Sequence, residues 1–331
     1  MKNLAIIGAG SWGTALAIVL APRLPRIRLW VYEADLAVRM RQTRENDVYL
    51  PGFELPQHVE VTSELATALE GAECVLSVMP SHLTRGLYQQ MLPYLQESML
   101  FVSATKGLEN GTLLRMSDVI REVLAPLTHR VAVLSGPTFA REVAAFQPTA
   151  LVVASQDAAL ASAIQAAFSG PTFRLYTSSD PTGVEIGGSV KNVVAIGAGV
   201  LHGLGLGHNP MAALITRGLA EMGRLSLAMG GRPQTMAGLA GLGDLVLTCN
   251  GELSRNRTVG VQLAQGRKLA EIVGSMKMVA EGVKTTNAAV DLAKRYCVEM
   301  PICEQMSQML ESGVSPRAAI QSLMERSLKG E

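Results

Sequence analysis

Two charged side chains stand alone in long apolar stretches. Lys191 is the only Asp, Glu, Lys or Arg between positions 186 and 216, and Asp244 is the only one between positions 233 and 251. Burial of an unpaired ion is costly, so each residue needs a partner and is the obvious candidate for the other. A desolvated lysine has a lowered pKa and can exchange protons near neutral pH. The pair is a candidate acid–base centre, with a purely structural ion pair as the alternative.

A run of hydrogen-bond donors, Ser254-Arg255-Asn256, follows Asp244. The planar guanidinium of Arg255 matches the geometry of a phosphate group, and the two flanking side chains could add neutral donors. The alternative is a helix start, in which Ser254 or Asn256 caps a helix over 257–265. Capping and anion binding can coexist, so the run is a candidate phosphate site under both interpretations.

A glycine-rich turn lies near the N-terminus. Gly8, Gly10 and Gly13 have Gly-x-Gly-x-x-Gly spacing, directly after a predicted strand and at the start of a predicted helix. The first glycine suits a tight turn, the second lets the backbone approach a pyrophosphate, and the third allows the helix to pack closely on the strand. We therefore expect a dinucleotide-binding βαβ unit with the phosphates at the helix N-terminus.

The residues after the second predicted strand bear on the choice of dinucleotide. We expect this strand to end at Glu33, where a carboxylate would accept the ribose 2′-hydroxyl of NAD. Arg39 and Arg41 follow closely and could instead meet the 2′-phosphate of NADP. These residues leave the choice between NAD and NADP open.

Two further polar segments follow predicted strands. Lys106 and the turn Ser135-Gly136-Pro137-Thr138 each come just after a strand's C-terminal end, which is the edge where open α/β sheets bind ligands. Lys106 could neutralise a phosphate or hold a substrate oxygen, and a surface loop lysine is the alternative. The glycines of 197–203 lack the three-glycine spacing and indicate close helix packing instead.

The elements that must position these residues divide into two halves. The first half alternates β-branched runs with helix-like stretches, and several runs are apolar throughout, as in strands covered on both faces. We expect a doubly wound, mostly parallel Rossmann-type α/β sheet over 1–182 and an all-helical domain over 183–331, after a turn-rich segment at 177–183. The predicted strands are Leu4–Ile7, Ile27–Tyr32, Cys74–Val78, Leu100–Ser103, Val131–Leu134, Leu151–Ala154 and Phe173–Tyr176. The predicted helices are Thr14–Leu20, Leu83–Leu92, Met211–Met229, Arg257–Gln265, Lys284–Arg295 and Ile302–Leu310, with another starting at Ser315-Pro316.

Composition argues against several classes of protein. The 29 Lys plus Arg residues balance 28 Asp plus Glu. The net charge of +1 therefore gives no excess of positive charge that would indicate binding to nucleic acid or to an anionic membrane. The four cysteines and five histidines show no metal-ligand spacing, and we expect free thiols and no metal. With no signal-peptide pattern and no uninterrupted apolar segment of about 20 residues, we expect a cytoplasmic protein without membrane insertion.

Taken together, these motifs resemble the NAD(P)-dependent glycerol-3-phosphate dehydrogenase family of the soluble bacterial type. The matching stretches are Gly8–Leu16 (GAGSWGTAL), Ala104–Leu108 (ATKGL), Ser135–Ala140 (SGPTFA), Gly188–Val193 (GSVKNV), Gly241–Leu245 (GLGDL) and Ser254–Arg257 (SRNR). They follow one another in order, and the similarity extends beyond Glu281-Gly282. The resemblance implies interconversion of dihydroxyacetone phosphate and sn-glycerol 3-phosphate with NAD or NADP, which feeds phospholipid synthesis.

The resemblance also implies a role for each matching residue. Lys191 would be the general acid/base on the substrate oxygen, and Asp244 would support it. The expected substrate-binding residues are Lys106, Gly136, Thr138, Asn192, Thr248, Ser254, Arg255 and Asn256. Together with the glycine turn, the expected cofactor-binding residues are Gly8, Gly10, Ser11, Trp12, Gly13, Tyr32, Glu33, Lys106, Ala140, Arg255, Val279 and Glu281. Tyr32 stands where relatives often carry a basic residue or histidine, which leaves the cofactor preference open.

Two other functions fit parts of this pattern. One is another β-hydroxyacid-type dehydrogenase with the same domain plan and a non-phosphorylated substrate. The other is a non-catalytic dinucleotide-sensing regulator, which would need a DNA-binding or partner element that the sequence does not display. Such a regulator would also have no use for lone charges at Lys191 and Asp244. From the apolar faces of the helical second domain we expect a homodimer, while feedback regulation and physiological direction are left open.

Overall fold

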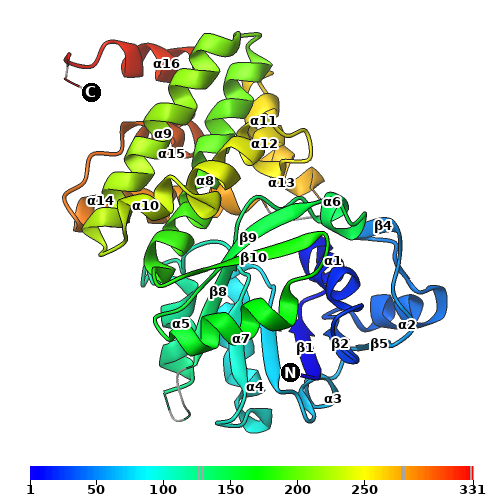
Figure 1. The fold of residues 1–331 in the computed structure, drawn as a ribbon. Helices are drawn as coiled ribbons and strands as arrows, with labels where there is room; N and C mark the ends of the chain where they lie inside the picture. Colours follow the sequence, from blue (N-terminus) through cyan, green and yellow to red (C-terminus); the bar gives the residue numbers. More distant parts are fainter. Residues whose placement is uncertain (126, 128–129, 277–279, 329, 331) are drawn as a thin grey trace. The chain divides into compact units, whose positions relative to one another are not determined.

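The computed structural model describes residues 1–125, 127, 130–276, 280–328 and 330 of the 331-residue chain (Figure 1). The chain divides into two compact units. The first contains Met1–Glu109 and Leu114–Glu185, and the second contains Asn110–Leu113 and Ile186–Glu331.

The first unit is built on an eight-stranded sheet with the order β10-β9-β8-β7-β6-β1-β2-β5. Neighbouring strands are parallel except for β8 and β9, which are antiparallel. Because β2 lies on one side of β1 and β6 on the other, the strand order reverses at β1, where open α/β sheets bind ligands. The predicted mostly parallel, doubly wound sheet is confirmed. Its strands are β1 (Asn3–Ile7), β2 (Arg26–Trp30), β5 (Val59–Thr62), β6 (Cys74–Ser77), β7 (Leu100–Ser103), β8 (Val131–Ser135), β9 (Thr149–Ala154) and β10 (Phe173–Ser178).

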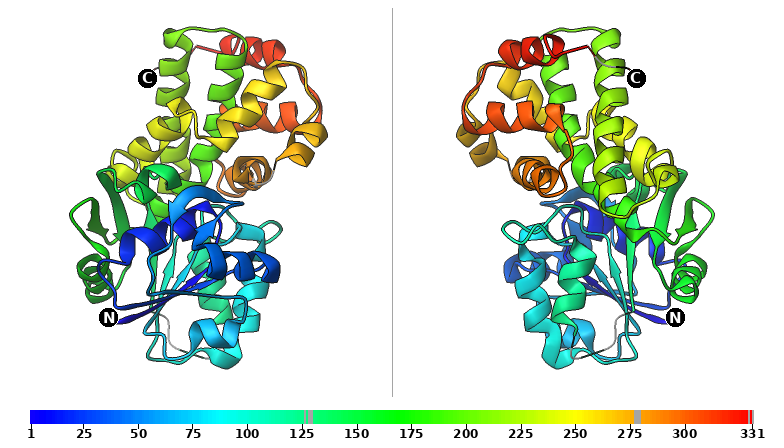
Figure 2. Two further views of the ribbon diagram at one scale, coloured as in Figure 1. Left: turned by 90° about the vertical axis from the view of Figure 1, so that its right-hand side faces the viewer. Right: turned by 90° about the vertical axis from the view of Figure 1, so that its left-hand side faces the viewer.

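Helices cover both faces of this sheet (Figure 2), which explains why β1 is apolar from Leu4 to Ile7. Leu4 and Ile6 of β1 belong to one buried cluster with residues of α1 and α7, whereas Ala5 and Ile7 belong to a second cluster with residues of α4 and α5. Successive side chains of a strand point to opposite faces, so every position from Leu4 to Ile7 needs an apolar residue. The helices of the first unit are α1 (Ser11–Leu20), α2 (Ala34–Thr43), α3 (Leu65–Leu69), α4 (Thr84–Met91), α5 (Met116–Val123), α6 (Ala140–Ala144) and α7 (Ala158–Phe168).

Several predicted boundaries in this unit were wrong. Strand β2 ends at Trp30, so Glu33 does not end the strand but immediately precedes α2. The edge strand β5, and the antiparallel ribbon of β3 (Glu45–Asn46) and β4 (Leu50–Glu54), were not predicted. These strands are short and partly exposed, so they lack the apolar runs of the central strands.

The described part of the second unit is helical, as predicted. The long helix α8 begins in the first unit at Pro181, so the expected turn at 177–183 is only partly correct: β10 continues to Ser178, and the Asp180 carboxylate accepts a hydrogen bond from Gly183 N at 2.8 Å. Ser315 caps the last helix, as predicted. The elements are α8 (Pro181–Gly203), α9 (His208–Ala228), α10 (Pro233–Met236), the π-helical turn η3 (Leu239–Gly243), α11 (Asp244–Asn250), α12 (Arg255–Ala264), α13 (Leu269–Ser275), α14 (Glu281–Arg295), α15 (Pro301–Glu311) and α16 (Pro316–Met324).

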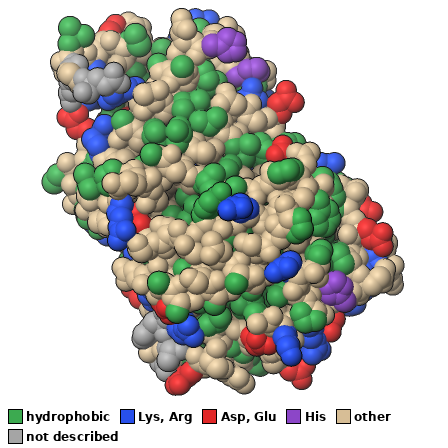
Figure 3. Space-filling view, viewed as in Figure 1, with side chains coloured by type: hydrophobic (Ala, Val, Ile, Leu, Met, Phe, Trp, Pro, Cys, Tyr) green, Lys and Arg blue, Asp and Glu red, His purple; other side chains and the backbone are tan. Residues whose placement is uncertain are grey.

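The surface carries charges of both signs. On the face drawn in Figure 3, Lys and Arg side chains are interspersed with Asp and Glu, and hydrophobic side chains lie between them. On the described part of that face no extended basic area gathers, in keeping with the net charge of +1. Among the described residues, α8 is the one helix whose length and composition would suit a membrane span, and its most apolar window is wholly buried within the protein.

Close packing of α8 against α12 accounts for two of the glycines that the sequence places at 197–203, Gly199 and Gly203. A Cβ at Gly199 would lie 2.0 Å from the carbonyl oxygen of Arg257, and a Cβ at Gly260 would lie 1.9 Å from that of Ile196. Real Cβ atoms do not approach so closely, so the two helix backbones are in direct contact. The predicted helix-packing role of this segment is confirmed.

We predict that Gly199→Ala lowers the free energy of unfolding by about 2–3 kcal/mol, because α8 and α12 must separate to admit the methyl group. Gly223→Ala in α9 is the matched control, because a Cβ at Gly223 would meet no described atom within 4 Å. Alanine is favoured over glycine inside a helix, so the control gains up to about 1 kcal/mol. Urea unfolding followed by circular dichroism measures the free energy of unfolding of both variants. Equal changes in the two variants would contradict the close packing of α8 against α12.

Candidate functional site

The glycine turn joins β1 to α1 and requires its glycines for different reasons. Gly8 has a φ of +116°, and a Cβ there would lie 2.4 Å from the carbonyl oxygen of Val78. A Cβ at Gly13 would lie 1.8 Å from the carbonyl oxygen of Gly8, so the helix packs directly on the turn. At Gly10, by contrast, a Cβ would meet no described atom within 4 Å. The open space at Gly10, at the N-terminus of α1, is where a pyrophosphate would approach the backbone.

The residues around this turn fit a dinucleotide. Trp12 lies in the first turn of α1, and its buried indole Nε1 has no hydrogen-bond partner among the described residues. A buried donor without a partner is expensive, and a bound acceptor would satisfy it. The Ser11 hydroxyl donates to the carbonyl oxygen of Tyr49 at 2.6 Å, which ties the loop before β4 to the turn.

The residues that follow β2 have distinct partners. Glu33 Oε1 accepts a hydrogen bond from the Tyr49 hydroxyl at 2.6 Å. Tyr32 is 79% exposed, and its ring meets the ring of Trp30 edge to face. Arg39 pairs with acidic side chains instead of Glu33: its guanidinium lies 3.1 Å from Asp35 Oδ2 on the same helix.

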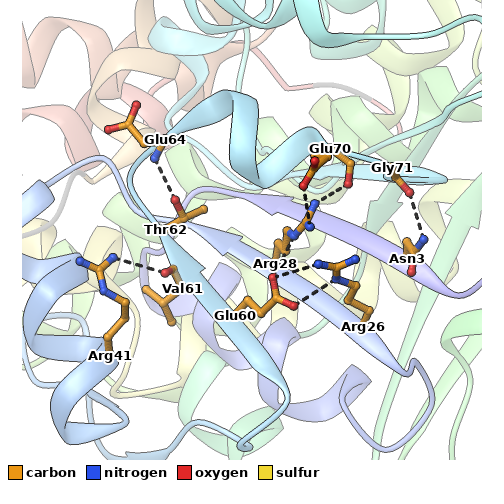
Figure 4. Close-up of polar contacts among 10 residues, drawn as sticks. All are labelled: Asn3, Arg26, Arg28, Arg41, Glu60, Val61, Thr62, Glu64, Glu70 and Gly71. Carbon is orange, nitrogen blue, oxygen red and sulfur yellow. Dashed lines mark hydrogen bonds and ion pairs between the residues drawn. The ribbon is translucent and has the colours of Figure 1, made fainter.

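The edge of the sheet next to these residues is held by hydrogen bonds from arginine side chains (Figure 4). Arg28 in β2 is 5% exposed and donates hydrogen bonds to Glu60 of β5 and Glu70 beyond α3. On the same edge, the Arg41 guanidinium donates to the carbonyl oxygen of Val61 at 3.4 Å. These bonds tie β2, β5 and α3 together and so fix the strand that leads to Glu33.

The carboxyl ends of β7 and β8 bring together three of the predicted substrate-binding residues. Lys106 Nζ and the Thr138 hydroxyl both donate to the carbonyl oxygen of Gly136, at 3.1 and 3.2 Å. Gly136 has a φ of +152°, and a Cβ there would lie 2.7 Å from the Cβ of Leu151, so no larger residue fits. Ala140 is the first residue of α6 and packs on the core below. This cluster holds one positive charge at the ligand-binding edge of the sheet.

In the second unit, Lys191 of α8 and Asp244 of α11 form the predicted pair. Lys191 Nζ donates to Asp244 Oδ1 and to the Thr248 hydroxyl oxygen, the latter at 2.7 Å. The Thr248 hydroxyl in turn donates to the backbone carbonyl of Asp244 at 2.6 Å. The three residues are between 1% and 5% exposed, so the ammonium and carboxylate are both desolvated and stabilise one another.

A second glycine contact places Asp244 against α8. A Cβ at Gly187, one turn before Lys191, would lie 2.5 Å from the carbonyl oxygen of Ala240 in η3. Because α11 follows η3 without a break, this close approach brings Asp244 within reach of Lys191. The π-helical turn is a type of local distortion that occurs frequently at functional sites.

A buried amide pair links α8, α12 and α14. Asn256 Nδ2 donates to Asn192 Oδ1 at 2.9 Å, and Asn256 Oδ1 accepts from Gly282 N at 2.9 Å. Ser254 is the N-cap of α12, since its hydroxyl oxygen accepts from Arg257 N. Of the two capping candidates, Ser254 is therefore the cap and Asn256 is not.

Arg255 and Glu281 begin α12 and α14 respectively. Desolvation by neighbouring protein atoms lowers the pKa of the Arg255 guanidinium, although part of the side chain is exposed, and the charge of Glu281 opposes this shift. Val279, the remaining predicted cofactor contact, lies outside the described residues.

Sequence reasoning missed Asn46 and Tyr49, which hold the loop beside the glycine turn. Asn46 is fully buried, and its side chain donates to the carbonyl oxygen of Ala9 at 2.8 Å. Asn-Asp is a turn signal, but nothing in its spacing links it to residues 37 positions away. Within the described ranges, no group of three His, Cys, Asp or Glu side chains could hold a metal ion, and the four cysteines are free.

Comparison with known proteins gives a consistent picture over the whole chain. Residues 3–161 match the family model for the NAD-dependent glycerol-3-phosphate dehydrogenase N-terminus, and residues 180–321 match that for its C-terminus. A protein of Koribacter versatilis named glycerol-3-phosphate dehydrogenase [NAD(P)+] is 58% identical over 98% of both chains. One of the same name from Citrifermentans bemidjiense is 54% identical over 100% of this chain and 99% of the relative. The crystal structure of glycerol-3-phosphate dehydrogenase from Coxiella burnetii superposes with a TM-score of 0.94 at 41% identity, covering 98% of this chain and 99% of the other.

Proposed function

We propose a role for each site residue on the premise that this chain belongs to the NAD-dependent glycerol-3-phosphate dehydrogenase family. The chain is an NAD(P)-dependent oxidoreductase that interconverts dihydroxyacetone phosphate and sn-glycerol 3-phosphate, a precursor of glycerophospholipids. Neither a dehydrogenase for a non-phosphorylated substrate nor a non-catalytic sensor fits these matches as well. The buried centre of Lys191, Asp244 and Thr248 is the observation that carries the proposal.

The proton chemistry is assigned to Lys191. The dinucleotide, when bound, supplies a hydride to the carbonyl carbon. Negative charge then grows on the carbonyl oxygen, and a protonated Lys191 stabilises it and donates the proton that completes the alcohol. In the reverse direction the neutral amine of Lys191 takes the hydroxyl proton. The positive charge that carbonyl reduction needs thus comes from the protein, so this mechanism uses no metal.

Asp244 and Thr248 hold Lys191 in place for this task. The Asp244 carboxylate favours the charged ammonium, which burial alone would disfavour. Because the Thr248 hydroxyl gives its own proton to the Asp244 backbone carbonyl, its oxygen faces Lys191 as an acceptor. Two partners therefore fix the direction of Nζ, and a fixed donor loses less entropy when it meets the substrate oxygen.

The remaining substrate contacts suit a phosphorylated three-carbon molecule. Arg255 presents a planar fork of donors at the start of α12, and we assign it to the phosphate, with Ser254 and Asn256 beside it. In the first unit, Lys106 is assigned to the substrate, because its ammonium is held at the carboxyl ends of the strands by Gly136. Thr138 and Asn192 complete the proposed substrate contacts, each held by a hydrogen bond of its own.

The domain assignment follows from the same elements. We propose that residues 1–182 form the dinucleotide-binding domain and that 183–331 form the helical domain that carries proton transfer. The proposed cofactor contacts are Gly8, Gly10, Ser11, Trp12, Gly13, Tyr32, Glu33, Lys106, Ala140, Arg255, Val279 and Glu281.

We also propose that the protein is a cytoplasmic homodimer. Its free cysteines suit a reducing compartment. Exposed apolar side chains of the second unit, such as Leu242, Val246 and Leu253, would suit a dimer interface.

We predict that Lys191→Ala lowers kcat for reduction of dihydroxyacetone phosphate by at least about 100-fold, the usual range for loss of a general acid. The Kd for NADH, measured by fluorescence titration, should stay within about twofold because the glycine turn is untouched. Turnover near that of the wild-type chain in a correctly folded Lys191→Ala variant would remove Lys191 from the mechanism.

We predict that Arg255→Ala raises the KM for dihydroxyacetone phosphate by about 10- to 100-fold, as expected for loss of hydrogen bonds to a charged group. At saturating dinucleotide, the kcat/KM for plain dihydroxyacetone, which has no phosphate, should change little and serves as the control. Ser254→Ala is the companion variant, because it removes the cap of α12 without removing a charge. A KM that Arg255→Ala leaves unchanged would show that this run serves only to start the helix.

A further inference from the structure

The hydroxyl of Tyr49 holds the carboxylate of Glu33. The donor–acceptor distance of 2.6 Å is typical of a hydrogen bond from a hydroxyl to a charged oxygen, which is about twice as strong as one between neutral groups. The hydrogen bond to Glu33 and partial burial raise the pKa of Tyr49 to about 12. The phenol is therefore a proton donor throughout the neutral pH range, and the carboxylate is its acceptor.

The loop that carries Tyr49 is anchored to the glycine turn. The backbone carbonyl of Tyr49 accepts from the Ser11 hydroxyl at 2.6 Å, and its backbone N–H donates to Asn46 Oδ1 at 3.0 Å. The Asn46 side chain also donates to the carbonyl oxygen of Ala9 at 2.8 Å and to the Thr14 hydroxyl at 2.9 Å. The bond to Glu33 thus starts from a ring whose backbone is fixed to the turn on two sides.

The charged side chains around α2 make this corner acidic. Arg39 lies 3.1 Å from Asp35 and 3.3 Å from Asp47, so one guanidinium serves two carboxylates. Arg41 donates to the backbone carbonyl of Val61. A ribose 2′-phosphate carries about two negative charges at neutral pH and would meet the carboxylate of Glu33, while Arg39 is already paired with two carboxylates.

We infer that Tyr49 is a specificity-determining residue for the dinucleotide: its hydroxyl fixes Glu33 in the position that accepts the ribose 2′-hydroxyl of NAD and repels the 2′-phosphate of NADP. The inference rests on the proposed use of the glycine turn as the dinucleotide site. A carboxylate can accept several hydrogen bonds, so Glu33 can hold Tyr49 and a ribose hydroxyl together. This chain therefore prefers NAD, and Tyr49 acts as a positioning residue through Glu33.

The test is to measure the Kd of NADH and of NADPH for the full chain without substrate, by isothermal titration calorimetry. The wild-type chain should bind NADH more tightly. Tyr49→Phe keeps the ring and removes the hydroxyl, so the ratio of the NADPH Kd to the NADH Kd should fall by about 10-fold, a typical effect of one hydrogen bond to a charged group. Tyr176→Phe, an exposed tyrosine of β10, is the matched control and should leave the ratio unchanged.

Glu33→Gln separates a positioning role from a direct one. This variant keeps the shape of the Glu33 side chain and removes its negative charge, so the ratio of the NADPH Kd to the NADH Kd should fall further than in Tyr49→Phe. If Tyr49 acts through Glu33, adding Tyr49→Phe to Glu33→Gln should change the ratio little. A wild-type preference for NADPH, a ratio that Tyr49→Phe leaves intact, or an undiminished effect in the Glu33→Gln background would each overturn the inference. Failure of the wild-type chain to bind either dinucleotide would instead overturn the proposed use of the glycine turn.

Discussion

A lysine ammonium buried in an apolar interior is the constraint on which the second unit depends. Transfer of such an ion out of water is expensive unless a carboxylate and further hydrogen bonds compensate for the lost hydration. Asp244 and Thr248 provide that compensation, and both come from one short helix that begins at Asp244. The apolar sequence around Lys191 follows from the same requirement, because α8 must bury its other faces in the core.

Contacts in the rest of the helical unit hold α8 and its neighbouring helices in place. Backbone contact at Gly187 sets the distance between α8 and η3, and backbone contact at Gly199 sets the distance between α8 and α12. The amide pair of Asn192 and Asn256 joins the same two helices next to Lys191 and extends to α14 through Gly282. Arg255, which we propose binds the substrate phosphate, is therefore carried by a helix whose position is fixed relative to Lys191.

Much of the fold and of the candidate site could be predicted from the sequence, because the motifs were local or because charged residues stood alone in apolar stretches. The pairing of Lys191 with Asp244 could be inferred because each lacked any other charged neighbour along the chain. The partners of Glu33 could not, because the loop of Asn46 and Tyr49 has no regular period and its contacts to the glycine turn join distant parts of the chain. The end of β2 was misplaced for a related reason: apolar residues continue past Trp30, although strand pairing stops there.

We propose that Lys191 moves the proton, while Asp244 and Thr248 hold its ammonium group in place. Chemical rescue of Lys191→Ala by small primary amines tests it most directly, because an added amine can occupy the space left by the lysine side chain. We expect methylamine or ethylamine to restore oxidation of sn-glycerol 3-phosphate in a saturable manner, and more basic amines of similar size to restore it more. A variant that folds and binds NADH but shows no rescue by any of these amines would contradict the role of Lys191 in proton transfer.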